Sequence, residues 1–242
     1  MSTALVVGGT SGIGLATARL LAARGTEVHV VGRTAARLDA LATSDPALHG
    51  HRADGGDRAA MDAVVAGIGT IDQLVVTLSG SEGMGPVADL DQDMLRRAFD
   101  AKFWAHLTTV QAVLPRLATG GPNGAGSITL LGAISARAAM AGTAGLAALN
   151  GAVEALVKPL AVELAPIRVN AVSPGVVDTA WWAGWPDEAR EQFFAQSAKA
   201  LPVGRVATAE DVAEAVVLAA TNPNLTGTVL ETDGGARLVS LG

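Results

Sequence analysis

Three glycines near the start of the chain have the spacing of a loop that holds phosphate groups. Gly8, Gly12 and Gly14 follow an apolar run and open a helical pattern in VVGGTSGIGLATARLLA. Such glycines permit a tight turn and let backbone N–H groups at a helix N-terminus approach a pyrophosphate. In this strand–turn–helix setting they predict dinucleotide binding rather than a turn without a ligand. The residues between them are expected to share the site: Thr10, Ser11 and Ile13.

An arginine stands where dinucleotides with and without a 2′-phosphate are distinguished. The second predicted strand, EVHVVGR, ends with Gly32 and then Arg33. An acidic residue at this tip would bind a ribose 2′-hydroxyl, whereas a guanidinium can grip a 2′-phosphate with two hydrogen bonds. We therefore expect NADP(H) to be favoured over NAD(H). The alternative is that Arg33 is a solvated loop charge.

The composition argues against several other classes of protein. The chain has 242 residues and no cysteine, and its four histidines lack HExxH-type spacing, so we expect no metal site. Its net charge of −6, without a basic run, argues against nucleic acid and anionic membrane surfaces. No apolar run reaches the roughly 20 residues of a membrane span. The strand pattern begins almost at once, which leaves no room for a signal peptide, and we expect a cytoplasmic protein.

The elements that must position these residues alternate along the chain. Apolar and β-branched runs predict strands at 4–9, 27–32, 72–80, 126–132, 167–175 and 227–235. Helical patterns lie between them, at 16–25, 34–42, 57–69, 91–118, 152–164 and 209–222. Strands alternating with helices of this length imply βαβ units and a buried parallel sheet. The prediction is an α/β Rossmann fold, a doubly wound parallel sheet in a single domain over residues 1–242.

With these motifs the sequence resembles the short-chain dehydrogenase/reductase family over nearly all of its length. The glycine loop matches the family's TGxxxGxG, with Val7 in place of the threonine. The resemblance implies that Asp54 contacts the adenine and that Gly55 lies beside it. It also implies that the segment NAVSPGVVDT lines the nicotinamide carboxamide and the phosphates. The residues concerned there are Pro174, Gly175, Val177 and Thr179.

The sequence departs from this family at all four catalytic positions. The tyrosine and lysine of the family's YxxxK fall on Leu146 and Asn150, and the chain contains no tyrosine at all. The family's serine falls on Ala133, and the asparagine of its fourth helix falls on Lys102. The family's NNAG segment reads VTLS, which brings Ser79 near the cofactor.

Three residues are candidates for the missing proton donor. Lys102 is the first, with a surface or interface lysine as the alternative, because a partly buried amine can have a tuned pKa. Ser135 is the second, since strand-like geometry would put it on the same face as Ala133, although it could be an ordinary strand-end hydroxyl. His106, one helical turn after Lys102, is more simply a core or interface histidine. Asn150 is expected to keep a cofactor-positioning role, because an amide can hydrogen-bond ribose hydroxyls.

Aromatic residues gather in the segment TAWWAGWPDEAREQFF. The resemblance implies that this region, about 180–200, is a substrate lid, and a bulky apolar or aromatic substrate is expected beneath it. A subunit interface is the alternative, because tryptophan is also enriched there. Met84 is a candidate for the opposite wall. The candidate substrate contacts are Trp181, Trp182, Trp185 and Phe194, with Phe193 beside them.

Three functions remain open on this reasoning. The first is an NADP(H)-dependent oxidoreductase that reduces a carbonyl, quinone, imine or activated double bond with a non-standard proton donor. The second is a cofactor-binding sensor or inactive partner subunit without hydride transfer. The third is an isomerase or cyclase in which NADP(H) is structural. Alanine-rich helices with little surface charge, paired across subunits in the family, predict a homo-oligomer and most simply a tetramer.

Overall fold

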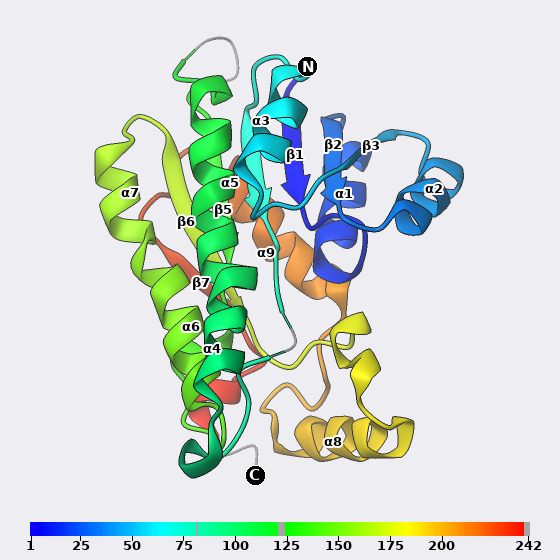
Figure 1. Cartoon of the computed structure of the whole chain (residues 1–242), viewed down its shortest axis with the longest axis vertical. Helices are drawn as coiled ribbons and strands as arrows, with labels where there is room; N and C mark the ends of the chain where they lie inside the picture. The colour runs from blue at the N-terminus through cyan, green and yellow to red at the C-terminus, as the bar shows by residue number, and fades with distance from the viewer. Residues whose placement is uncertain (81, 121–123, 240–242) are drawn as a thin grey trace.

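Seven parallel strands form one sheet in the order β3-β2-β1-β4-β5-β6-β7 (Figure 1). The structure is a computed structural model, and it describes residues 1–80, 82–120 and 124–239. The arrangement confirms the predicted α/β, doubly wound Rossmann fold. The strands are β1 (Thr3–Val7), β2 (Glu27–Gly32), β3 (Leu48–Arg52), β4 (Gln73–Val76), β5 (Ser127–Leu131), β6 (Arg168–Pro174) and β7 (Val229–Thr232).

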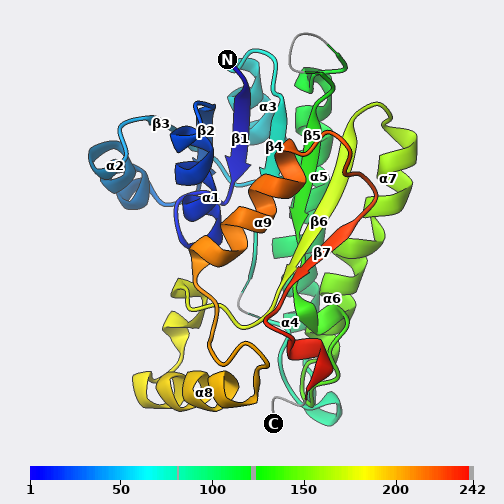
Figure 2. The ribbon, with the colours of Figure 1, turned by 180° about the vertical axis from the view of Figure 1, so that it is seen from behind.

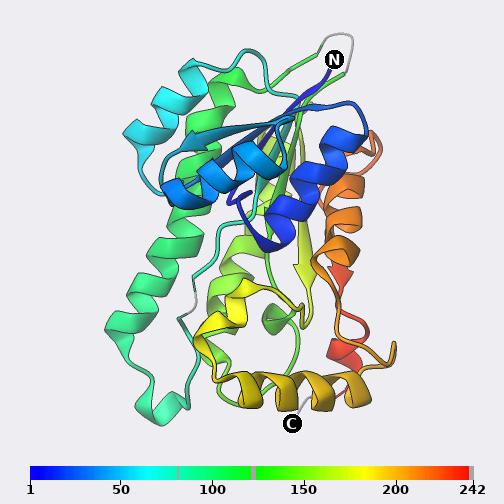
Figure 3. The ribbon, with the colours of Figure 1, turned by 90° about the vertical axis from the view of Figure 1, so that its right-hand side faces the viewer.

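Helices cover the sheet on both faces, and Figure 3 shows the two helical layers with the sheet between them. The helices α3, α5, α6 and α7 lie on one side, and α1 and α9 lie on the other. The helices are α1 (Gly12–Ala23), α2 (Ala35–Ser44), α3 (Arg58–Ala66), α4 (Gln92–Phe99), α5 (Ala105–Val113), α6 (Ala144–Ala155), α7 (Val157–Glu163), α8 (Asp187–Ala200) and α9 (Ala209–Thr221).

Alternation along each strand supplies two separate cores. In β1, Leu5 and Val7 belong to the cluster beneath α3 and α5, whereas Ala4 and Val6 belong to the cluster beneath α1 and α9. Successive side chains of a strand point to opposite faces, so a run of apolar residues is needed when both faces are covered. This is why the inner strands read as continuous apolar runs.

The strand order reverses between β1 and β4, which are neighbours in the sheet although β2 and β3 come between them in sequence (Figure 2). Loops that leave neighbouring strands in opposite directions open a crevice at the carboxyl ends of the strands, where ligands bind in this class of fold. The glycine loop leaves β1 at this point. The helix α8 lies beyond the same ends of the strands, at the bottom of Figure 3.

The long helical pattern predicted at 91–118 is interrupted. The helices α4 and α5 are joined by a π-helical turn at Asp100–Trp104, and α5 ends in a 3₁₀ turn at Leu114–Arg116. A π-turn adds a residue to the helix and rotates the side chains that follow, and such turns are frequent at functional sites. Lys102 is the central residue of this turn.

One helical stretch, Ala144–Glu163, is long and apolar enough to cross a membrane by length and composition, and 28% of its most apolar window is buried. It corresponds to α6 and α7. Leu149, Val153 and Val157 on its inner face are buried against the rest of the fold. The stretch thus packs against the fold along one face, and a helix of this length and composition is by itself weak evidence for a membrane span.

Candidate active site

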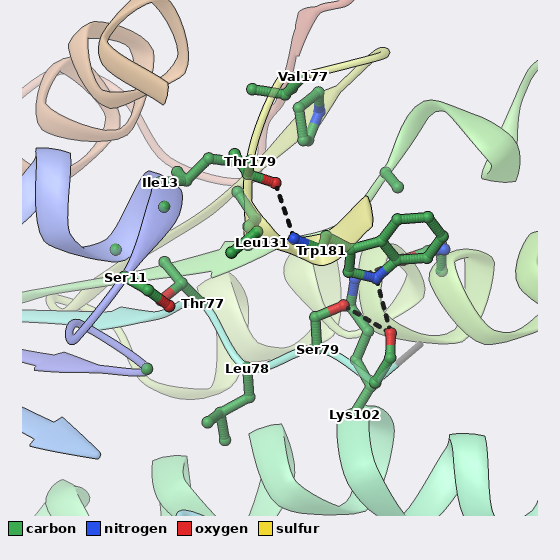
Figure 4. Close-up of a pocket in the computed structure, with 18 of the residues that line it drawn as sticks. Ser11, Ile13, Thr77, Leu78, Ser79, Lys102, Leu131, Val177, Thr179 and Trp181 are labelled. Carbon is green, nitrogen blue, oxygen red and sulfur yellow. Dashed lines mark hydrogen bonds between the residues drawn. The ribbon is translucent and has the colours of Figure 1, made fainter. Parts of the chain in front are cut away.

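A cavity of about 500 Å³ lies at the carboxyl ends of the strands, between the glycine loop and the segment before α8 (Figure 4). It brings together residues from widely separated parts of the sequence. Asp54 and Phe194 are not among its lining residues. The predicted site residues that line it are Gly8, Thr10, Ser11, Gly12, Ile13, Gly14, Arg33, Gly55, Ser79, Lys102, Ser135, Asn150, Pro174, Gly175, Val177, Thr179, Trp181, Trp182 and Trp185.

The glycine loop has the geometry that a bound pyrophosphate requires. Gly8 and Gly12 have φ angles of +88° and +52°, which side-chain-bearing residues rarely adopt. A Cβ at Gly14 would lie 2.4 Å from the carbonyl oxygen of Gly8. Ser11, the N-cap of α1, makes no side-chain hydrogen bond to the helix, so the first N–H groups of α1 stay open to a ligand. These features fit a dinucleotide.

Two arginines stand at the outer end of the cavity. Arg33 Nη1 lies 3.6 Å from Asp54 Oδ2, and both side chains are exposed. Arg37, in the first turn of α2, also lines the cavity and donates through Nη1 to Ser11 Oγ at 3.3 Å. Asp54 therefore lies beside Arg33 at the rim instead of inside the cavity. Arg37 was missed from the sequence, although its position one helical turn after Arg33 was a usable signal.

Lys102 is buried, with only 4% of the residue exposed, and it reaches the cavity from the π-turn (Figure 4). Its Nζ donates to Asn150 Oδ1 at 2.6 Å and to the carbonyl oxygen of Gly132 at 3.2 Å. An ammonium carries three hydrogens, so one more can be donated. Burial lowers the pKa of Lys102 to about 8, and the nearby Glu154 carboxylate opposes that shift.

Asn150 joins Lys102 to Ser135. Its Nδ2 donates to Ser135 Oγ at 3.0 Å and to the carbonyl oxygen of Leu146 at 3.0 Å, while its Oδ1 accepts from Lys102. Both amide hydrogens are therefore used within the protein. The expectation that Asn150 offers its amide to a ribose is weakened, because only one lone pair of Oδ1 stays free.

Ser135 does not lie on a strand. It belongs to a 3₁₀ turn, Ile134–Ala136, so the strand-like geometry assumed from the sequence is wrong. The turn nevertheless buries Ser135 against the cavity, and its Oγ accepts a hydrogen bond from Asn150. Its own hydroxyl hydrogen is free to be donated toward the cavity. Ala133 and Leu146 also line the cavity, with no group that can transfer a proton.

His106 is wholly buried on α5, and its Nδ1 lies 2.7 Å from the carbonyl oxygen of Lys102. A backbone carbonyl can only accept, so Nδ1 carries the hydrogen. Burial and then the charge of Lys102 lower the pKa of His106 to about 3. A neutral imidazole outside the cavity lining is not a proton donor near neutral pH. Its contact instead satisfies a carbonyl within the π-turn.

The aromatic residues form a connected roof over one end of the cavity. The ring of Trp182 lies 4.6 Å from that of Trp181, 5.1 Å from Trp185 and 5.0 Å from Phe193. Trp181 Nε1 donates to the carbonyl oxygen of Gly80 at 2.8 Å, which ties the roof to the loop after β4 (Figure 4).

One of the predicted substrate contacts needs correction. Phe193 lines the cavity and its neighbour Phe194 does not, although Phe194 packs 5.7 Å from Trp182. The segment is helical from Asp187, so adjacent residues point in directions about 100° apart and only one of the two rings can face the cavity. Met84, expected on the opposite wall, does line the cavity.

The comparisons with known proteins agree with this fold. A family described as Enoyl-(Acyl carrier protein) reductase matches residues 7–237. Cis-4-hydroxycyclohexanecarboxylate dehydrogenase of Sinomonas cyclohexanicum is 34% identical over 247 residues, covering 96% of this chain and 95% of that protein. L-xylulose reductase of Mesocricetus auratus is 31% identical over 238 residues, covering 96% and 95%.

Solved structures show the same similarity. A small-chain dehydrogenase in complex with NADPH is 35% identical, has a TM-score of 0.83 and is matched over 98% of this chain and 99% of that one. A short chain dehydrogenase/reductase family protein is 32% identical, with a TM-score of 0.85 and coverage of 98% of both chains. The chain belongs to the short-chain dehydrogenase/reductase family of oxidoreductases.

Proposed function

We propose that the protein is an NADP(H)-dependent oxidoreductase that acts on a bulky apolar or aromatic carbonyl, quinone or imine. One observation carries the proposal: a single cavity joins the phosphate-binding glycine loop, two arginines, a buried lysine and an aromatic roof. The named relatives are dehydrogenases and reductases, and one structural neighbour holds NADPH.

The glycine loop and the N-terminus of α1 would hold the pyrophosphate, and Arg33 with Arg37 would hold a 2′-phosphate. Asp54 and Gly55 would lie at the adenine. When bound, the nicotinamide supplies or accepts a hydride, which is chemistry that no side chain provides. The segment after β6, which begins at Pro174 and includes Gly175, Val177 and Thr179, would line the nicotinamide end together with Ser79.

The substrate end of the cavity is apolar except at its base. Its walls include Met84, Met140 and Leu146, and the roof is formed by tryptophans. A substrate that fills such a pocket must be largely apolar. A polar group buried there would lose its hydrogen bonds to water and gain none from the protein. Lid residues 180–200 would exclude water from it.

Lys102 and Ser135 supply the two hydrogen-bond donors at the base. Lys102 Nζ keeps one hydrogen free after it donates to Asn150 and Gly132, and Ser135 Oγ keeps its own hydroxyl hydrogen. Donors fixed in advance at a buried site stabilise negative charge as it develops on a substrate oxygen or nitrogen. We propose that Lys102 gives the proton and that Ser135 orients the accepting atom. Asn150 positions both.

The test is NADPH consumption, followed at the nicotinamide absorbance band, against aromatic ketones, quinones and imines. The proposal expects consumption that needs both enzyme and substrate and exceeds that with NADH. If a preparation that binds NADPH consumes none with any of these classes, the protein is better described as a cofactor-binding sensor or partner subunit, or as a catalyst of a redox-neutral isomerisation. Those alternatives are favoured by Ala133 and Leu146, which cannot transfer a proton and which occupy the positions of the family's serine and tyrosine.

We also propose a homotetramer in the cytoplasm. The π-turn and α7 each expose a large apolar side chain, with Trp104 53% and Val162 81% exposed. Apolar surface of this kind is a usual mark of a contact between subunits.

A further inference from the structure

Glu154 is a largely buried carboxylate of which only one oxygen is paired. It lies on α6, one helical turn after Asn150, and its side chain is 8% exposed. Oε2 accepts a hydrogen bond from Arg137 Nε at 2.9 Å. Oε1 is buried and has no hydrogen-bond partner among the residues that the structure describes. A buried charged oxygen without a partner is destabilising, so its neighbourhood must contain something that compensates.

The unpaired oxygen lies against the same glycine that binds Lys102. A Cβ at Gly132 would be 3.0 Å from Glu154 Oε1, so a side chain at this position would press on the carboxylate. The carbonyl oxygen of Gly132 accepts from Lys102 Nζ at 3.2 Å. The π-turn that carries Lys102 packs against α6. Gly132 therefore lies between the buried ammonium of Lys102 and the buried carboxylate of Glu154, which are more than 4.0 Å apart and form no direct salt bridge.

We propose that Glu154 is the buried counter-charge of Lys102, a positioning residue that acts across Gly132 and keeps the ammonium charged. The catalytic meaning of this inference rests on the proposed function. The pairing itself does not, because the charge of Lys102 can be measured without turnover.

The electrostatics of the site agree with the geometry. Burial lowers the pKa of Lys102 to about 8, and Glu154 is the one charge that raises it. An opposite charge favours the ammonium form even without a direct salt bridge, because electrostatic attraction is strong where water is excluded. Without Glu154, burial would act alone and the pKa of Lys102 would fall further.

Other titratable groups around Lys102 do not take this role. His106 on α5 is neutral because its pKa is lowered to about 3. Arg137 has the same charge as Lys102 and bonds Glu154 through Oε2, while Oε1 has no hydrogen-bond partner among the described residues. Asp100, on the π-turn itself, is exposed. The strands β4 and β5 carry no ionisable side chain, and the charged residues of α4 are exposed: Asp93, Arg96 and Arg97.

The same ion-pair network contains a matched control. Arg137 also donates to Glu231 Oε1 at 2.7 Å, and Glu231 Oε2 lies 2.6 Å from Arg237 Nε. Glu231 and Glu154 thus hold the same arginine, but only Glu154 adjoins Gly132 and Lys102. A glutamine at either position keeps the shape and an oxygen for Arg137 while it removes one charge.

The experiment is a direct titration of Lys102 by NMR. The chain has only three lysines, Lys102, Lys158 and Lys199, so a protein labelled with ¹³C at the lysine Cε gives three signals. The Lys102→Met variant assigns one of them. The midpoint of that signal is measured in the parent protein, in Glu154→Gln and in Glu231→Gln, with circular dichroism to verify that each variant is folded.

We expect Lys102 to titrate below the other two lysines in the parent protein, and its midpoint to fall by about half a pH unit or more in Glu154→Gln. Glu231→Gln should leave it unchanged. An unchanged midpoint in Glu154→Gln, or equal shifts in both variants, would overturn the inference. If no substrate supports NADPH oxidation, the proposed function fails while this titration still decides the pairing.

Discussion

At the scale of single residues, the first prediction concerns Lys102, the proposed proton donor. Replacing it by methionine keeps an unbranched side chain, one atom shorter, and removes the ammonium group. We expect kcat to fall by about 10²- to 10⁴-fold, the usual contribution of a positioned acid, while the Kd for NADPH changes little. Steady-state kinetics and fluorescence titration measure the two quantities. Lys158→Met, at an exposed lysine, serves as the control. Equal losses in both quantities would remove Lys102 from the proton-donor role.

The proposed preference for NADP(H) is also tested at single residues. Arg33→Ala should weaken NADPH binding by roughly 10- to 100-fold, since hydrogen bonds to charged groups contribute about 1.5–3 kcal/mol, and it should leave NADH binding nearly unchanged. Arg37→Ala is expected to act in the same direction. Arg24, which pairs with Glu214 on the surface, provides a charge-matched control. If Arg33→Ala weakened the two cofactors equally, the 2′-phosphate assignment would be wrong.

At the scale of elements, the roof before α8 depends on Trp182. Its ring touches those of Trp181, Trp185, Phe193 and Phe194, so it is the centre of the cluster. We expect Trp182→Leu to raise KM for an apolar substrate about tenfold, the effect of losing about 1.4 kcal/mol of aromatic contact, with little change in NADPH affinity. Trp182→Phe should have a smaller effect. Faster proteolytic cleavage at 180–200 in Trp182→Leu would verify that the roof has loosened, and an unchanged KM would exclude it from substrate binding.

At the scale of the whole molecule, the exposed apolar faces predict association. Static light scattering at micromolar concentration should give about four times the chain mass of 24.3 kDa. Val162→Glu puts a charge on the exposed face of α7 and should shift the mass toward smaller species, because a buried unpaired charge is costly in an interface. A monomeric mass for the unmodified protein would refute the tetramer.

Stability should depend on pH through His106. Its pKa is lowered to about 3 in the folded protein, against an ordinary value of 6.5, so between these values the unfolded chain binds more protons. The contribution of His106 to the free energy of unfolding is therefore fully present above about pH 6.5. It falls as the pH drops below this value, by up to about 1.4 kcal/mol per pH unit. Urea unfolding at pH 7 and pH 5 measures the loss.

His106→Gln should reduce that slope, since an amide can donate to the carbonyl of Lys102 without titrating. The lowered pKa values of His29 and His51 add a smaller dependence of the same sign, which the variant retains. Equal slopes in the parent protein and in His106→Gln would contradict this assignment.

The sequence by itself determined the class of fold and the cofactor end of the cavity. Six of the seven strands were predicted, because apolar β-branched runs and turn glycines are local signals. The edge strand Leu48–Arg52 was missed, since LHGHR has two histidines and a glycine and is covered less than the inner strands. The glycine loop was recognisable for the same local reason, because its spacing and its strand–turn–helix setting are contiguous in sequence.

Only the tertiary structure decided how the substrate end is built. That Lys102 is buried depends on a π-turn and on packing against α6, neither of which is encoded in the spacing of residues along one helix. The contacts of Lys102 with Asn150 and Gly132, and of Gly132 with Glu154, join residues far apart in the chain. The burial, direction and pKa of a side chain arise from such non-local contacts. Local sequence patterns determine the helices and strands, but not which side chains these elements bring together in a cavity.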